Sequence, residues 1–142
     1  MHIRPFEPKD EDPVVALWHQ CGLVRPQNDP RDDIRRKLAV RPDLFLVGVV
    51  DGRIVATVMA GYEGHRGWLN YLAVDTPHRR KGLARAMVVA AEGLLRDSGC
   101  PKINLQIRTS NQGVVEFYRR IGYTTDDVVS MGKRLVHDHQ PS

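Results

Sequence analysis

The sequence predicts an α/β fold in which about four helices flank a mixed sheet of about seven strands. The 142 residues fit one domain, expected to span 1–142. Hydrophobic residues make up 42% of the chain, which is enough for an ordinary core. Extended and helical patterns also alternate, with a β-rich first half and a β-α-β-α-β-β second half. That order is typical of helices packed on a mixed sheet.

The first half of the chain carries signals for two helices and four strands. One helix is expected from about Asp12, because apolar residues follow it at helical spacing. A second is expected near Pro30, with carboxylates in its first turn, where negative charge interacts favourably with the helix dipole. Asp51-Gly52 is a strong signal for a two-residue hairpin turn. The four expected strands are His2–Phe6, Leu44–Val50, Ile54–Tyr62 and Trp68–Val74.

The second half is expected to contain longer connections and two further helices. The alternation of the strand at Trp68–Val74 is imperfect near Tyr71, which favours a β-bulge there. The loop DTPHRRKG leads to a long helix over Leu83–Asp97, which a following glycine and proline end in the usual way. The remaining expected elements are a strand at Ile103–Ile107, a helix at Asn111–Ile121 capped by Gly122, and closing strands around Tyr123 and at Val128–Leu135.

Composition is that of a globular protein from a reducing compartment. Cys21 and Cys100 are the only cysteines and lack CxxC spacing, so no disulfide framework is expected. No apolar run approaches the ~20 residues that a membrane span needs. The N-terminus turns acidic at once and lacks the apolar core of a secretion signal. A cytoplasmic location is therefore expected.

The net charge of +4 favours an anionic ligand without identifying one. The basic stretch Arg35–Lys37 is mixed with Asp32 and Asp33 on an expected helix, and we interpret it as a solvated face. The basic run Arg79–Lys81 differs, because a glycine follows it at the start of the long helix. This loop is therefore the first candidate for an anion-binding site.

The segment HRRKGLA lies between an expected strand and an expected helix, where phosphate groups are often bound. The first N–H groups of a helix have no intrahelical partner, and the helix dipole favours an anion. Gly82 removes a side chain where the backbone must approach the ligand, and Ala84 is nearly as small. The segment is neither a P-loop nor a GxGxxG motif. Alone, it leaves open a phosphate site or an ordinary basic surface loop.

Two motifs together resemble a known family. Arg79-x-x-Gly82-x-Ala84 resembles the Q/R-x-x-G-x-G/A signature of the GNAT acetyltransferase superfamily, and it lies between a central strand and a long helix, as in that family. Downstream, NQGVVEFYRRIGY is similar to the family's N-x-x-A-x-x-x-Y block, with Val114 in place of the usual alanine. The resemblance covers nearly the whole chain. It is strongest to small bacterial acetyltransferases described as YpeA-like, through LVRPQNDPRDDIRRKL, GYEGHRGW, GCPKI and SMGKRL.

The resemblance implies the GNAT fold, a mostly antiparallel, twisted sheet whose fourth and fifth strands splay apart. The pantetheine arm of acetyl-coenzyme A (acetyl-CoA) is expected to enter that gap and pair with the backbone of the fourth strand. The turn before the long helix is expected to bind the pyrophosphate. The implied cofactor-binding residues are Leu72, Ala73, Val74, Arg79, Arg80, Lys81, Gly82, Leu83, Ala84 and Asn111.

The implied reaction moves an acetyl group from acetyl-CoA to a primary amine, without a metal ion. Tyr118 matches the family's general acid, which protonates the leaving thiolate, although it also suits a structural place on a helix face. A backbone N–H near Val74 is expected to stabilise the developing oxyanion. Glu63 is expected as the general base, directly or through a water, with His65 or a purely solvated role as alternatives. Tyr71 is expected to line the acceptor pocket.

The expected partner is an amine acceptor, either a small molecule or a protein N-terminus, with no membrane; assembly as a homodimer is left open. The main alternative is a non-catalytic acyl-CoA-binding module, which has no need of the acid Tyr118. A nucleic-acid binder is disfavoured, because only 6% of residues are aromatic and they do not alternate with basic ones. The pair His137-x-His139 lacks a third ligand nearby, so no metal site is expected.

Overall fold

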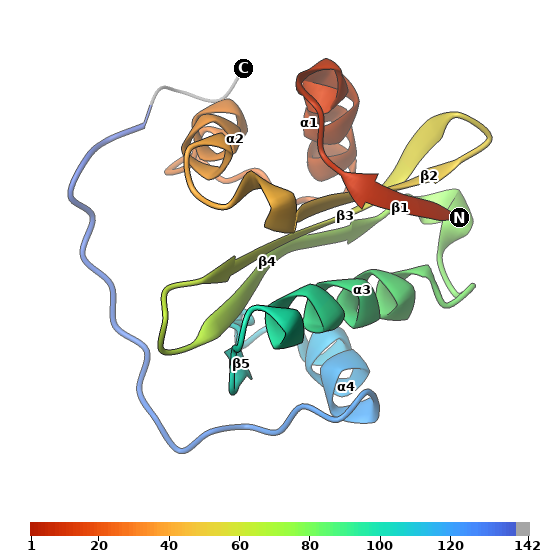
Figure 1. Ribbon diagram of the computed structural model, residues 1–142. Coiled ribbons are helices and arrows are strands. Elements are labelled where there is room, and N and C mark those ends of the chain that lie inside the picture. Colours follow the sequence, from red (N-terminus) through yellow and green to blue (C-terminus); the bar gives the residue numbers. More distant parts are fainter. Residues whose placement is uncertain (139–142) are drawn as a thin grey trace.

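The computed structural model describes residues 1–138, and its centre is a five-stranded sheet in the order β1-β2-β3-β4-β5 (Figure 1). Strands β1 to β4 pair antiparallel, and β5 pairs parallel with β4. The strands are β1 (His2–Pro5), β2 (Phe45–Val50), β3 (Arg53–Tyr62), β4 (Gly67–Val74) and β5 (Ile103–Asn104). The α-helices within 1–138 are α1 (Glu11–Gln20), α2 (Pro30–Leu38), α3 (Leu83–Asp97) and α4 (Gln112–Arg120). The predicted α/β class is confirmed.

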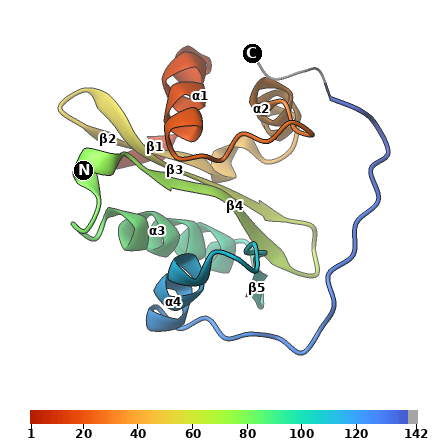
Figure 2. The same cartoon turned by 180° about the vertical axis from the view of Figure 1, so that it is seen from behind.

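The sheet separates two layers of helices. Helices α1 and α2 cover one face, and α3 and α4 lie on the other (Figures 1 and 2). Under α1 and α2 the core contains the fully buried side chains of Trp18, Ile34 and Phe45. On the other face, the core contains Met87 and Val88 of α3, which are also fully buried. The central strands β3 and β4 are therefore packed from both sides, as their apolar composition predicts.

Several helices and turns begin or end at the residues that the local sequence predicts. Asp51 and Gly52 form the turn between β2 and β3 with φ values of 50° and 74°, the left-handed conformation that such a turn requires. Helix α3 spans the predicted Leu83–Asp97. Gly122 follows α4 with a φ of 104° and donates its N–H to the carbonyl of Arg119, as expected of a helix cap. Over the described residues, the structure contains no helix with the length and apolar character of a membrane span.

The predicted bulge is present in β4. Thr57 of β3 faces Ala73 and Met59 faces Asn70, so two residues of β4 stand opposite one residue of β3. Tyr71 adopts the left-handed conformation with a φ of 52°. An extra residue of this kind bends the strand and redirects a side chain. The bulge turns the ring of Tyr71 toward α1, where it stacks on Trp18 with 3.8 Å between ring centroids.

The buried hydroxyl of Thr57 holds the bulge. It accepts a hydrogen bond from the indole N–H of Trp18 at 2.9 Å and donates one to the carbonyl of Tyr71 at 2.8 Å. Thr57 is fully buried, so water cannot replace either bond. Helix α1 and the bulge of β4 are thus joined through a single side chain of β3.

The prediction of about seven strands was wrong in the described part of the chain, because the two closing strands are absent there. Residues around Tyr123 and at Val128–Leu135 belong to an irregular tail that follows α4. The tail swings out beside the sheet and returns toward α2 (Figures 1 and 2). Its apolar side chains are exposed, as Val129 at 86% and Met131 at 90% show.

The contacts of the tail explain why no further strand pairs there. Strand β5 ends at Asn104, short of the predicted Ile107, and offers a backbone edge of only two residues. The tail meets it through side chains instead: Asp126 accepts hydrogen bonds from Asn104 at 2.8 Å and from Lys102 at 3.0 Å. Side-chain contacts of this kind satisfy few backbone groups, and strand pairing requires a backbone ladder.

We predict that Thr57→Val lowers the free energy of unfolding by about 1–3 kcal/mol, because it leaves the buried indole N–H of Trp18 and the carbonyl of Tyr71 without partners. Urea unfolding followed by tryptophan fluorescence measures the loss. Thr57→Ser is the control, since it keeps the hydroxyl and removes one methyl group worth about 0.8 kcal/mol. A valine variant as stable as the serine variant would contradict this role of the hydroxyl.

Candidate active site

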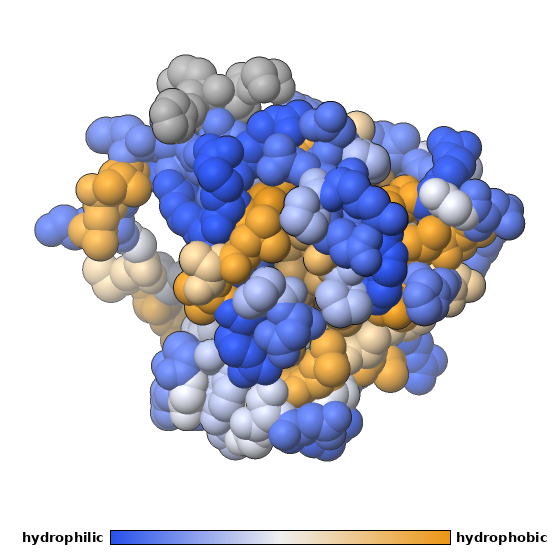
Figure 3. Space-filling model, turned by 45° about the horizontal axis from the view of Figure 1, so that its top comes forward, coloured by the Kyte–Doolittle hydropathy of each residue, from blue (hydrophilic) through white to orange (hydrophobic). Residues whose placement is uncertain are grey.

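A cleft of about 1470 Å³ opens where β4 and β5 part. The two strands pair only at Gly67 with Ile103 and at Trp68 with Asn104. Beyond that point the rest of β4 has no strand beside it on this edge in the described residues. The cleft is lined from both layers of helices, with residues of α2, β4, α3 and α4. On the side that carries α1 and α2, apolar residues form a strip between hydrophilic clusters (Figure 3).

The free edge of β4 presents backbone groups to the cleft. The N–H of Asp75 donates to the carbonyl of Val55 at 2.8 Å, on the β3 side. Because neighbouring residues of a strand turn their backbone groups to opposite edges, those of Val74 face the cleft. The carbonyl of Val74 accepts a hydrogen bond from the Arg79 guanidinium at 3.0 Å and one from the Cys21 thiol at 3.5 Å. Leu72, Ala73 and Val74 all line the cleft.

The turn before α3 lies at one end of the cleft. Gly82 stands at the N-cap with a φ of 79°, and Arg80 has a φ of 64°. No side chain caps this helix N-terminus, so its first N–H groups remain free for a ligand. Of the predicted residues, Arg79, Arg80, Gly82, Leu83 and Ala84 line the cleft, whereas Lys81 is exposed outside it.

The glycine at position 82 is required by backbone conformation. A Cβ on Gly82 would meet no atom within 4 Å, so space is not the constraint. A side chain at its positive φ is strained in any surroundings, most of all when it is β-branched. The sequence reasoning identified this glycine but attributed it to close approach of a ligand. The structure gives an additional cause, the left-handed turn that starts α3.

Tyr118 lines the cleft from α4. Its side chain is 6% exposed and its ring meets the rings of Phe117 and Tyr123 edge-on, at centroid distances of 5.0 Å and 5.3 Å. The hydroxyl has no hydrogen-bond partner among residues 1–138. Burial raises the pKa of Tyr118, so the hydroxyl keeps its proton across the physiological range. The structure therefore presents a protonated, unengaged hydroxyl to the cleft.

Asn111 lies at the start of α4, where its side-chain oxygen caps the helix. It accepts a hydrogen bond from the N–H of Val114 at 3.3 Å. This is the usual role of asparagine at an N-cap. Asn111 also lines the cleft, and its amide nitrogen is left to meet a ligand.

Tyr71 lines the cleft from the β4 bulge and contacts α2. Its hydroxyl donates to a carboxylate oxygen of Asp33 at 2.5 Å. Burial and, next, this hydrogen bond raise the pKa of Tyr71, because both disfavour the phenolate. Both residues line the cleft, as was predicted for Tyr71. The bulge of β4 thus places a polar pair, Tyr71 and Asp33, in the cleft.

On helix α2, the burial of one basic residue differs from the sequence prediction. The stretch Arg35–Lys37 was interpreted as a solvated face, but Lys37 is only 9% exposed, and Arg36 and Lys37 line the cleft with Asp33. The interpretation holds for Arg35 and Arg36, which are exposed, and is wrong for Lys37, because Ile34, three residues before it, is fully buried on the same side of the helix. That spacing was the available signal.

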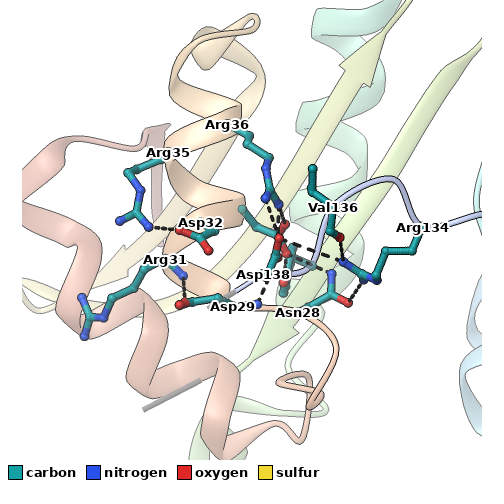
Figure 4. Close-up of polar contacts among 11 residues, drawn as sticks. Asn28, Asp29, Arg31, Asp32, Arg35, Arg36, Arg134, Val136 and Asp138 are labelled. Carbon is teal, nitrogen blue, oxygen red and sulfur yellow. Dashed lines mark hydrogen bonds and ion pairs between the residues drawn. The ribbon is translucent and has the colours of Figure 1, made fainter. Parts of the chain in front are cut away.

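The end of the described chain is attached to α2 through a carboxylate (Figure 4). Asp138 receives two hydrogen bonds from the Arg36 guanidinium, at 2.5 Å and 3.1 Å, and one from the N–H of Asp29 at 3.2 Å. The hydrogen bonds from Arg36 are the main cause that lowers the pKa of Asp138 to about 2. Arg134 adds a hydrogen bond to Asn28 at 3.1 Å. No metal site was expected at the pair His137-x-His139. His137 lies in this tail, and His139 lies outside the described residues.

Glu63 and His65 lie in the turn between β3 and β4, and neither lines the cleft. The Glu63 carboxylate accepts hydrogen bonds from the backbone N–H of His65, at 3.0 Å, and from that of Arg66. It thereby closes the turn. The structure brings Tyr71 and Tyr118 to one cleft but does not bring Glu63 there.

Comparisons with known proteins agree with this geometry. Residues 11–123 match the acetyltransferase (GNAT) family. An acetyltransferase of Pectobacterium atrosepticum is 46% identical over 140 residues, which cover 99% of both chains. The structure of Ard1 from Thermoplasma volcanium has a TM-score of 0.75 at 27% identity, over 87% of this chain and 82% of that one. AAC(6′)-Iy in complex with the bisubstrate analogue CoA-S-monomethyl-acetylneamine has a TM-score of 0.76 at 17% identity, over 94% and 97%.

Proposed function

The chain belongs to the acetyltransferase (GNAT) family, and from that premise we propose that it transfers an acetyl group from acetyl-CoA to a primary amine. The observation that carries the proposal is the continuity of one cleft from the α3 turn, past Tyr118, to the β4 bulge. In the proposed reaction a thioester and an amine meet within this cleft. A neighbour of this fold was solved with a CoA-containing analogue, which shows that the fold accommodates CoA.

The cofactor is proposed to lie along the free edge of β4. The pyrophosphate binds at the turn Arg79–Ala84, where free helix N–H groups and guanidinium groups favour an anion. The pantetheine arm pairs with the exposed backbone groups around Leu72 and Val74, like an added strand. Asn111 donates to the arm through its amide nitrogen. Lys81 contributes charge near the phosphates from outside the cleft.

The reaction is proposed to proceed by direct attack. The neutral amine attacks the thioester carbonyl carbon, and a backbone N–H near Val74 stabilises the oxyanion that forms. The carbon–sulfur bond then breaks, and Tyr118 gives its proton to the leaving thiolate. Glu63 stays the predicted base for the proton that the amine loses; because it does not line the cleft, this role requires a bridging water.

Two classes of acceptor fit the proposal, a small molecule and a protein N-terminus. The alternative function, a non-catalytic acyl-CoA-binding module, predicts cofactor binding without turnover. A screen of amines with acetyl-CoA and a thiol-release readout separates the two. The unengaged hydroxyl of Tyr118 favours the enzyme, because a binding module gains nothing from an acid at that place.

We predict that acetyl-CoA raises the melting temperature. A ligand at one hundred times its dissociation constant adds about 2.7 kcal/mol to the free energy of unfolding, because it binds only the folded state. Differential scanning fluorimetry over a series of acetyl-CoA concentrations measures the shift. A melting curve unmoved by saturating acetyl-CoA would end the proposal.

Substitution of Gly82 tests the phosphate-binding turn. Gly82→Val is expected to weaken acetyl-CoA binding by tenfold or more, about 1.4 kcal/mol, because a branched side chain opposes the left-handed turn that presents the helix N–H groups. Calorimetry gives the affinity. Gly113→Val is a suitable control, since Gly113 lies on α4, has open space around it and lies outside the turn. Unchanged affinity in the Gly82 variant would place the phosphates elsewhere.

Tyr118→Phe separates catalysis from binding. The ring and its contacts are kept and only the proton donor is lost, so we expect kcat to fall by about tenfold to a hundredfold and the acetyl-CoA affinity to stay within about threefold. Because the Tyr118 pKa is raised, the loss is expected at every pH from about 6 to 9. Full activity over that range would make Tyr118 structural, and a large loss of affinity would make it a binding residue.

A further inference from the structure

Lys37 is a buried lysine that lines the cleft without an ion-pair partner among the described residues. Its side chain extends over β3, and its ammonium lies 3.8 Å from the place of a Cβ on Gly61. The carboxylate of Asp43 lies beyond ion-pair distance and is bound by Arg41 at 2.9 Å. Burial lowers the pKa of Lys37, because it takes the ammonium out of water and the charge of Asp43 offsets this only in part.

Asp33 lies one helical turn before Lys37 on α2 and lines the same cleft. Side chains four residues apart on a helix are neighbours, about 6 Å apart at Cβ. No ion pair joins Asp33 to Lys37 among the described residues; the Asp33 carboxylate instead accepts hydrogen bonds from Tyr71 at 2.5 Å and from Arg36 at 3.3 Å. The cleft therefore presents a negative group at the bulge and a positive group one turn away.

The neighbouring residue on α2 already binds a carboxylate. Arg36 binds the carboxylate of Asp138 through two hydrogen bonds, and the side chain of Asp138 is only 1% exposed (Figure 4). A buried carboxylate requires such partners. Among the described residues of this half of the cleft, Lys37 is a buried cation with no ion-pair partner, whereas Arg25, which also has none, is exposed to water.

We infer that the acceptor amine also carries an acidic group, a carboxylate or a phosphate, which binds Lys37 while the amine lies near Asp33 at the β4 bulge. This inference rests on the proposed function, because it names the class of amine that the acetyl group reaches. The ion pair gives the buried ammonium the partner that it lacks. An amine without an acidic group leaves Lys37 unpaired, so acidic amines are the better acceptors.

Matched pairs of acceptors test the inference with acetyl-CoA and a thiol-release readout. Glycine, β-alanine and 4-aminobutanoate are each compared with their primary amides, and the dipeptide Ser-Glu amide with Ser-Gln amide. O-Phosphoethanolamine is compared with ethanolamine, which separates phosphate from carboxylate. We expect the acidic member of at least one pair to have a kcat/KM about tenfold or more above its neutral counterpart.

Variants of Lys37 assign the preference to this residue. In Lys37→Met, which keeps the length of the side chain, we expect acidic and neutral acceptors to differ by less than about threefold. Lys37→Arg is expected to keep part of the preference, because it keeps the charge. Lys9→Met is the matched control, since Lys9 is an exposed lysine outside the cleft. The acetyl-CoA melting shift, measured on every variant, reports folding and cofactor binding.

The possible failures are distinguishable. If acetyl-CoA does not stabilise the wild-type protein, the proposed function itself fails. If it does, the inference is overturned by neutral acceptors that react as well as acidic ones, by a Lys37→Met variant that keeps the preference, or by no reaction with any acceptor of the panel. A preference that is lost in Lys37→Met and retained in Lys9→Met supports it.

Discussion

The hydroxyl of Thr57 is the point on which the geometry of the cleft depends. It joins the indole of Trp18 on α1 to the carbonyl of Tyr71 in β4, and both bonds are out of reach of water. The bulge would otherwise cost a left-handed conformation at a bulky residue, which is strained. The core packs around Trp18 and Thr57, so contacts from both α1 and β3 offset the strain at Tyr71. The position of the cleft then follows from the direction that the bulge gives to β4.

The same bulge links the two halves of the proposed reaction. On one side, the strand that follows it ends at Val74 with backbone groups turned to the open edge. On the other side, the ring of Tyr71 reaches α2 and binds Asp33. A shift of register at the bulge would therefore move the cofactor edge and the acceptor end together, because a slip of one residue exchanges the two faces of a strand. The two sites cannot be repositioned independently in this fold.

Local chemistry made much of the fold predictable from sequence. The turn at Asp51-Gly52, the extent of α3 and the bulge at Tyr71 each follow from a few neighbouring residues, and all three are present. The closing strands failed, because pairing depends on an edge elsewhere in the chain, and β5 is only two residues long. Lys37 was missed because its charge indicated a solvated face, although its spacing from the buried Ile34 places it on the packed side of the helix.

The placement of Lys37 indicates that the proposed acceptor half of the cleft is not built for stability alone. A lysine and an aspartate one turn apart on a helix normally pair at the surface, where each helps the helix slightly. Here the aspartate is committed to Tyr71 and Arg36, and the lysine is buried beside it. A methionine of similar length would fill the same space without desolvating a charge. Local rules are broken most often at sites that bind or react, where the charge serves a ligand and the rest of the core offsets the cost.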